Sequence, residues 1–350
     1  MKNPIPIIAL LFFSFSMHCI AQTDFLTNLS APVGILCNGD DLYVVENNAG
    51  KISKIDVTAD PPEAKELISG LEFPSRLARY NNDLFISEFG GTHIYKINIT
   101  DTNPSLTTVI SDINSPDGIA IFGHYLYFTE TYKGTLSRVD LNQTTLNPTV
   151  VVSGLSSPKD IFVYKNELYI CESGADKVTK INLNSNNPSR ITVCTAIESC
   201  HGIFIANDIL FVTQRNLNKV SKIHLNDPNK VAEDFLTNIN ECVDISTNSN
   251  NTIIYITSYT DNKIVKYEDN FLNIKDKTLN KPLMVTPNPA TNYITLKNNT
   301  ESTSYTIFNL LGKQIKKSYT VANAPIDITD LNPGMYFIKT EKNTFKFIKK

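Results

Sequence analysis

Short apolar runs separated by polar turns recur along most of the chain with a period of 42 residues. Six segments open these units, and they begin 42 residues apart at Pro32, Pro74, Pro116, Pro158, Cys200 and Cys242. Each opening is followed by an aromatic-containing run such as residues 42–46, then by a third run with a basic residue. A fourth apolar run closes each of the first five units. No helical periodicity of similar length competes with this pattern, so it predicts four β-strands per unit.

Four short strands in a repeat of about 42 residues are typical of a propeller blade. The six units therefore predict an all-β, six-bladed propeller. The sixth unit lacks a fourth apolar run, but residues 23–29 nearly duplicate residues 233–239, five periods away. We expect residues 24–29 to add the outer strand of the sixth blade and close the ring, because closure removes unpaired sheet edges.

The repeats contain two motifs that mark a family resemblance. Tyr127-Phe128-Thr129-Glu130 is similar to the tetrapeptide of six-bladed YWTD propellers, and Pro116-Asp117-Gly118 resembles the blade opening of NHL-repeat and gluconolactonase-like propellers. The resemblance covers about residues 23–270. It implies the propeller fold, but this superfamily contains receptors, scaffolds, hydrolases and lyases, so it does not specify an activity.

The N-terminus has the features of a secretory signal peptide. Lys2 precedes an apolar core at residues 5–15, and Cys19 and Ala21 offer small residues before Gln22. The apolar core is too short for a membrane span, which needs about 20 residues. We predict a Sec signal peptide over residues 1–21. A lipoprotein signal centred on Cys19 is the less favoured alternative, because His18 is bulky.

Residues 270–350 differ from the repeats in their sequence pattern and in their charge. A polar linker is predicted at residues 270–282, and residues 283–350 alternate between apolar and polar positions. This segment has nine lysines and four acidic residues (+5), whereas residues 22–282 have 22 basic and 31 acidic residues (−9). Such asymmetry favours two domains with different tasks: a propeller at residues 22–269 and a second domain at residues 283–350.

Residues 283–350 resemble the type A C-terminal sorting domain of the type IX secretion system. The resemblance is carried by Pro287, Asn288, Pro289, Gly312, Gly334, Tyr336, Lys349 and Lys350. It implies a small Ig-like β-sandwich that is recognised by the outer-membrane secretion machinery, and a protein delivered through the periplasm to the outer cell surface or the medium. The alternative is an ordinary C-terminal β-sandwich used for binding.

Composition excludes several classes of protein. Hydrophobic residues make up 41% of the chain and charged residues 19%, which excludes a disordered chain, and the net charge of −3 argues against nucleic-acid binding. Five cysteines follow the signal peptide, an odd number without zinc-site spacing. We expect buried free thiols; Cys194 and Cys200 are the pair to test first for a disulfide.

The candidate site follows from propeller geometry, which brings the loops before strand one and after strand two to one mouth of the central channel. The charged residues that differ between blades there are Arg76, Asp117, Lys159, Asp160, His201 and Asp244. Around them we expect a structural ring of Glu46, Glu88, Glu130, Glu172 and Gln214, accepting backbone hydrogen bonds. The strand-three cations are expected to form cross-strand cation–π pairs, Lys54 with Tyr43 and Arg138 with Tyr127.

Three functions stay open from the sequence. We favour a non-catalytic, monomeric module that binds a carbohydrate, peptide or protein, with Arg76 or Lys159 contacting an anionic group. The alternative is a calcium-dependent, lactonase-like hydrolase: Asp117 matches the metal-binding Asp of the gluconolactonase resemblance, and His201 is a candidate general base. Val33-Gly34 stands where that family has a metal-binding Glu, which weakens the alternative. The third function is a scaffold for other surface proteins.

Overall fold

The computed structural model describes residues 22–185, 187–268, 284–297, 303–310, 312–320, 324–340 and 344–350. The chain divides into two compact units, residues 1–273 and 274–350. The predicted signal peptide and the predicted linker lie outside the described residues. Within those residues the only helices are two single 3₁₀ turns, η1 (Ser173–Ala175) and η2 (Arg215–Leu217). None of the described helices could cross a membrane.

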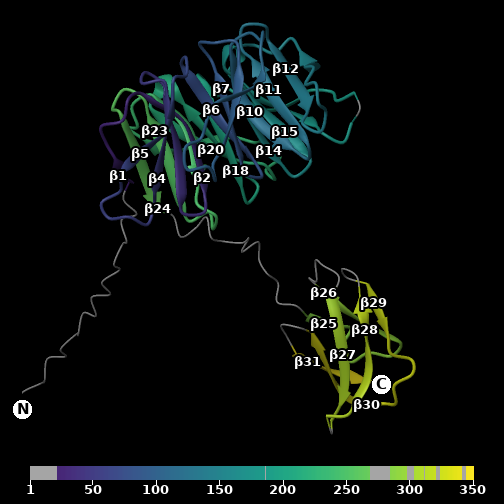
Figure 1. Cartoon of the computed structure of the whole chain (residues 1–350). Coiled ribbons are helices and arrows are strands. Elements are labelled where there is room, and N and C mark those ends of the chain that lie inside the picture. Colours follow the sequence, from purple (N-terminus) through teal and green to yellow (C-terminus); the bar gives the residue numbers. More distant parts are fainter. Residues whose placement is uncertain are drawn as a thin grey trace, which may run out of the picture. The chain divides into compact units, whose positions relative to one another are not determined.

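The described part of the first unit consists of six four-stranded antiparallel sheets (Figure 1). The first three are β2 (Pro32–Asn38), β3 (Asp41–Glu46), β4 (Lys51–Asp56) and β5 (Ala64–Ser69); β6 (Pro74–Tyr80), β7 (Asp83–Glu88), β8 (Ile94–Asn98) and β9 (Thr107–Ile110); and β10 (Pro116–Phe122), β11 (Tyr125–Glu130), β12 (Thr135–Asp140) and β13 (Thr149–Ser153). The next two are β14 (Pro158–Tyr164), β15 (Glu167–Glu172), β16 (Lys177–Asn182) and β17 (Ile191–Thr195); and β18 (Cys200–Ala206), β19 (Ile209–Gln214), β20 (Lys219–His224) and β21 (Ala232–Thr237).

The sixth sheet joins the two ends of the unit. It contains β22 (Cys242–Thr247), β23 (Ile253–Ser258) and β24 (Lys263–Glu268), and its outer strand is β1 (Gln22–Leu26). β1 pairs antiparallel with β24, for example Asp24 with Val265. The prediction that the N-terminal segment supplies this strand is confirmed, although the strand begins and ends two to three residues earlier than expected.

The first strands of the sheets contact one another in cyclic order. β2, β6, β10, β14, β18 and β22 each pack against the next, and β22 also packs against β2. The second strands are apolar and buried along almost their whole length because both of their faces meet a neighbouring sheet. One core cluster, for example, combines Val45 of the first sheet with Ile86 of the second. The outer strands are mostly exposed.

The predicted structural role of the ring is confirmed for its four glutamates, which accept backbone N–H groups, whereas Gln214 donates to the carbonyl of Glu198. Glu46 accepts the backbone N–H of Ser30 at 2.9 Å and the hydroxyl of Ser53 at 2.5 Å. The same two kinds of bond, to residues 16 before and 7 after, recur at Glu172. In the first four sheets, these carboxylates fix the segment that leads into the sheet.

The strand-three cations follow the expected pairing in part. Lys54 lies opposite Tyr43, with its ammonium 6.0 Å from the ring centroid. Arg138 lies opposite Tyr127 but donates a hydrogen bond to its hydroxyl at 3.2 Å. The guanidinium stacks instead on Tyr125, 4.5 Å from that ring. The predicted cation–π partner of Arg138 was wrong because its longer side chain reaches one pleat further along the strand.

The cysteines of the described residues are free thiols, as expected. Cys171, Cys194 and Cys200 belong to one buried cluster, and no disulfide joins Cys194 to Cys200. Burial raises the pKa of the Cys194 thiol to about 11. These side chains therefore serve as small apolar core residues.

The second unit has two antiparallel sheets in its described residues. One contains β25 (Met284–Thr286), β26 (Tyr293–Lys297) and β29 (Pro325–Asp327); the other contains β27 (Thr303–Asn309), β28 (Gln314–Thr320), β30 (Gly334–Thr340) and β31 (Thr344–Lys349). Ile294 and Leu296 of the first sheet share a core cluster with Ile307 and Ile338 of the second. The two sheets thus bury their apolar faces against each other.

Candidate functional site

Every first strand carries a β-bulge at its second and third residues. The ladder register shifts between the first and fourth residues in all six sheets, for example between Pro116 and Ile119. A bulge removes residues from the ladder and re-aims their side chains. In the third sheet, a hydroxyl from the second strand stabilises the bulged backbone. Thr129 accepts the N–H of Gly118 and donates to the carbonyl of Lys159, both at 2.9 Å. The sequence therefore folds so that two residues per strand are free to face the channel.

The third residues of these strands form a polar layer across the channel. Charged residues alternate with glycines from sheet to sheet: Gly34, Arg76, Gly118, Asp160, Gly202 and Asp244. A Cβ atom at Gly118 would lie 2.4 Å from the Lys159 carbonyl oxygen, and one at Gly202 would lie 2.5 Å from the Val243 carbonyl oxygen. Glycine thus permits the close approach of neighbouring strands that brings the three charged side chains together.

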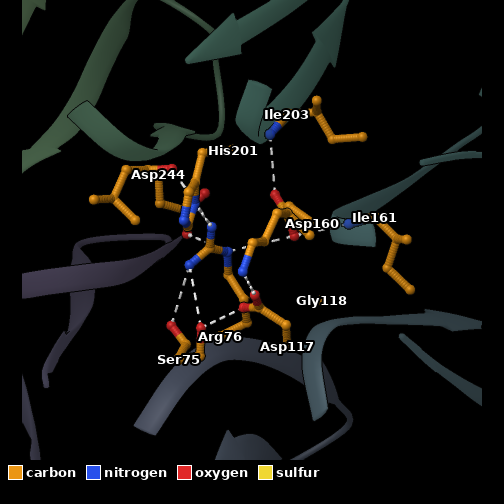
Figure 2. Close-up of polar contacts among 12 residues, drawn as sticks. Ser75, Arg76, Asp117, Gly118, Asp160, Ile161, His201, Ile203 and Asp244 are labelled. Carbon is orange, nitrogen blue, oxygen red and sulfur yellow. Dashed lines mark hydrogen bonds and ion pairs between the residues drawn. The ribbon is translucent and has the colours of Figure 1, made fainter. Parts of the chain in front are cut away.

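Arg76 lies at the centre of this polar layer with 2% of its surface exposed (Figure 2). Its Nε lies 3.5 Å from Asp160 Oδ1 and 3.7 Å from Asp244 Oδ2. Its Nη2 lies 2.8 Å from Nδ1 of His201. One guanidinium therefore connects its own sheet to side chains from three other sheets.

Both carboxylates of the layer also accept backbone hydrogen bonds from the next sheet. Asp160 Oδ2 accepts the N–H of Ile203 at 3.0 Å, and Asp244 Oδ2 accepts the N–H of Ile35 at 2.9 Å. Burial raises the pKa of Asp160 to about 7; the charge of Asp244 adds to this shift, and Arg76 opposes it. Burial also raises the pKa of Asp244, again against the effect of Arg76.

A pocket of about 340 Å³ opens on one side of the layer. We call it the mouth pocket, and its polar and aromatic lining includes Asn47, Phe89, Lys159, His201, Arg215 and Tyr259. The Lys159 ammonium lies 4.4 Å from the Phe89 ring centroid, and the Arg215 guanidinium lies 4.7 Å from the Tyr259 ring centroid. Two cations thus stand over aromatic rings in the same pocket.

Asp117 is held at the base of the mouth pocket. Its Oδ1 accepts the Ser75 hydroxyl at 2.5 Å, and its Oδ2 lies 3.3 Å from the Lys159 ammonium. Burial alone would raise the pKa of Asp117, but the nearby Lys159 and Arg76 outweigh it and hold the pKa at about 2. The carboxylate is therefore ionised at neutral pH and paired with Lys159.

His201 presents a donor to the mouth pocket rather than a base. A guanidinium can only donate, so the 2.8 Å contact makes Nδ1 of His201 the acceptor of the Arg76 Nη2 proton. Burial lowers the pKa of His201 well below its usual range, and the charge of Arg76 adds to the effect. The neutral ring then carries its proton on Nε2. This geometry argues against the general-base role that the sequence suggested for His201.

The residues around Asp117 do not fit a calcium ion. Calcium takes six to eight oxygen ligands, whereas Asp117 is paired with Lys159 and has a second cation, Arg76, close enough to lower its pKa. Among the described residues, no group of three or more His, Cys, Asp or Glu side chains is arranged to hold a metal ion.

We accordingly expect the melting temperature of the full chain to be the same in excess calcium and in EDTA, because a ligand stabilises only a state that binds it. Differential scanning calorimetry measures this directly. A calcium-dependent rise that disappears in Asp117→Asn would restore the metal site and contradict the assignment.

The structure brings all six sequence-predicted residues together but distributes them over two positions. Asp117, Lys159 and His201 are second residues of their strands and line the mouth pocket. Arg76, Asp160 and Asp244 are third residues and do not line it; they face a cavity on the other side of the polar layer. The expectation that all six lie at the mouth was wrong in this respect, because successive bulged residues face successive levels of the channel.

Three residues that line the mouth pocket, Asn47, Phe89 and Tyr259, were not predicted from the sequence. Asn47, Phe89, Arg215 and Tyr259 each follow the last residue of strand two in their sheets. This position differs in every sheet, whereas the residue before it is Glu or Gln in five of the six. Variation directly after a repeated residue is the signal that could have identified them.

In the second unit, the Pro287-Asn288-Pro289 motif binds the last strand. Asn288 Nδ2 donates to the carbonyl of Lys346 at 3.1 Å, and its Oδ1 accepts the N–H of Ile348 at 2.9 Å. Two further backbone bonds connect Ala290 with Ile348 and Lys350, both at 2.8 Å. The proline-containing motif at the start of the unit is therefore held by hydrogen bonds to the last strand, which leads into the lysine pair.

Two other motif residues have local structural roles. Tyr336 donates to the carbonyl of Asn332 at 3.0 Å and stacks on Phe347, with ring centroids 5.6 Å apart. Gly312 has a positive φ of 73° in the turn that follows Asn309, a conformation that favours glycine.

Comparison with known proteins identifies the two parts separately. Residues 284–350 match the family model of the secretion system C-terminal sorting domain. No curated protein matches the sequence. The structure is similar to a gluconolactonase from Xanthomonas campestris, with 11% identity, a TM-score of 0.59 and coverage of 70% of this chain and 88% of that chain.

Two further solved structures resemble the chain. A putative glucose dehydrogenase from Thermus thermophilus has 11% identity and a TM-score of 0.56, covering 71% of this chain and 99% of that one. Virginiamycin B lyase from Staphylococcus aureus has 15% identity and a TM-score of 0.53, covering 71% and 98%. At these identities the likeness shows the fold alone. The protein therefore combines a β-propeller fold like that of gluconolactonases with a type IX secretion C-terminal sorting domain, and it is secreted or displayed on the cell surface.

Proposed function

We propose that this protein is an exported, six-bladed β-propeller that binds an anionic group of an extracellular ligand in its mouth pocket and does not transform it. The six sheets, the cyclic contacts of their first strands and the pairing of β1 with β24 support a closed six-bladed ring. The shared core of the two C-terminal sheets supports an Ig-like sandwich that serves as the sorting signal.

The observation that carries the binding function is the set of donors in the mouth pocket. Lys159, Arg215 and the Nε2–H of His201 line one cavity of about 340 Å³, which is in the size range of ligand pockets. Hydrogen bonds from charged donors to a carboxylate, sulfate or phosphate are the strongest that such a pocket can form. The rings of Phe89 and Tyr259 offer apolar faces to the rest of the ligand. The ligand class is a carbohydrate, peptide or protein that carries such an anionic group.

The same geometry makes the lactonase-like alternative less favourable. A hydrolase of that kind needs a metal ion or a general base beside the substrate. Here Asp117 is occupied by Ser75 and Lys159, and the lone pair of His201 is directed at Arg76. We therefore assign binding rather than catalysis to this pocket.

Removing the Lys159 charge tests the proposal. We expect the full chain to bind benzoate in preference to the neutral isostere benzamide, and Lys159→Met to weaken benzoate binding about tenfold, because a hydrogen bond to a charged group contributes about 1.5–3 kcal/mol. Arg215→Gln should have a similar effect without exposing Asp117. Ligand-detected NMR titration measures both.

Lys133→Met is the matched control for this titration. Lys133 pairs with Glu130 of the glutamate ring but does not line the mouth pocket. Its replacement should leave benzoate binding unchanged. Equal affinity for benzoate and benzamide, or unchanged binding in both Lys159→Met and Arg215→Gln, would contradict an anion site.

A further inference from the structure

A second cavity, of about 320 Å³, lies on the opposite side of the polar layer from the mouth pocket. Its walls are mainly apolar side chains of the six first strands, such as Ile119, Ile161 and Phe162. Its floor is the polar layer itself, because Arg76, Asp160 and Asp244 all line it. We call it the inner cavity. The two hollows share no lining residue, so the inner cavity is a separate site.

The floor of the inner cavity contains an unsatisfied donor. Nε of Arg76 is the one buried side-chain polar atom in the described part of the chain that has no hydrogen-bond partner. It lies 3.5 Å from Asp160 Oδ1 and 3.7 Å from Asp244 Oδ2, within ion-pair range but without hydrogen-bond geometry. The contact of Nη2 with His201 holds the guanidinium in place (Figure 2). A buried donor left in this state favours a guest that accepts its proton.

The charges around Arg76 Nε select the kind of head group. Asp160 and Asp244 repel a carboxylate. An ammonium has no lone pair to accept the Nε proton, so it leaves this donor unpaired. A hydroxyl accepts from Nε–H and donates its own proton to a neighbouring carboxylate oxygen. The apolar walls favour a hydrocarbon body on such a head group. We propose that the inner cavity binds a small neutral alcohol with an apolar body, its hydroxyl seated between Arg76, Asp160 and Asp244.

Three probes with one hydrocarbon body test the head-group selection. We expect 1-hexanol to bind the full chain saturably and to shift the methyl NMR signals of Ile119, Ile161 and Ile245, all of which line the inner cavity. Hexylammonium and hexanoate should bind about tenfold more weakly, because each leaves at least one buried polar group unpaired. Equal affinity for the three probes, preference for a charged one, or no methyl shifts at the solubility limit of 1-hexanol would overturn the proposal. The last result would mean that the floor binds water only.

Filling the inner cavity provides the second test. Ala78 and Ala120 line it on neighbouring strands, so Ala120→Leu and, independently, Ala78→Leu should each weaken 1-hexanol binding at least tenfold. Using two sites keeps the test valid if one variant is unstable, and thermal unfolding identifies that case. Phe73→Ala, which alters only the mouth pocket, should bind 1-hexanol like the unaltered chain. Unchanged binding in both folded leucine variants would place the alcohol elsewhere and refute the site.

Discussion

Replacing Arg76 with methionine is expected to lower the free energy of unfolding by about 3–5 kcal/mol, because it leaves two buried carboxylates without their cation. Asp160 and Asp244 are 6% and 5% exposed, so water solvates these carboxylates far less well than it would at the surface. The same change removes the proton donor to Nδ1 of His201. Urea-induced unfolding of the full chain measures this change in free energy. Far-UV circular dichroism can follow the unfolding, because the sequence has no Trp for a fluorescence measurement.

Arg79→Met is the matched control, since Arg79 lies in the same strand, β6, but its side chain is exposed and contacts Asn38. Its replacement should change the free energy of unfolding by no more than about 0.5 kcal/mol. Adding Asp160→Asn and Asp244→Asn to Arg76→Met should recover part of the lost stability, because the unpaired charges are then gone. Similar losses for Arg76→Met and Arg79→Met would show that the polar layer is not a buried ion-pair network.

Removing residues 284–350 is expected to abolish delivery to the cell surface or medium, with the propeller accumulating in the periplasm. The deletion removes the entire matched sorting domain. In the described residues, that domain has its own core, so its loss need not unfold the propeller. Fractionation of the native host and protease accessibility of intact cells measure the location.

The complementary control is a periplasmic reporter fused to residues 284–350, which should reach the cell surface. A truncated chain that is still delivered normally would contradict the sorting role. A fusion that stays in the periplasm would show that the domain needs features of the propeller as well.

The fold was largely predictable because the repeat is regular. The 42-residue period locates all six first strands to the residue, and the duplicated segment at residues 23–29 identifies the strand that completes the sixth sheet. Regular sheets repeat their backbone geometry, so equivalent residues occupy equivalent places. The partner of Arg138 escaped prediction because stacking on Tyr125 rather than Tyr127 depends on the side-chain conformation, which a pairing register does not determine.

The sequence predicted which charged residues come together, but not how they are arranged. The six charged residues do meet, yet the bulge that separates Lys159 from Asp160 leaves no mark in the hydrophobic pattern. The protonation of His201 depends on a contact with Arg76, 125 residues away, that the packing of the first strands against one another creates. Local sequence can therefore nominate such residues, whereas their chemistry depends on which partners the fold brings to them.

The central claim is that the polar layer makes the mouth pocket a binding site lined by donors, with His201 neutral and protonated on Nε2. Nitrogen-15 NMR of the histidine side chains reports the protonation of each ring nitrogen directly. We expect His201 to carry its proton on Nε2 alone and to show no titration between about pH 5 and 8, the range in which an ordinary histidine changes charge. An imidazolium signal at pH 6, or a proton on Nδ1, would contradict it.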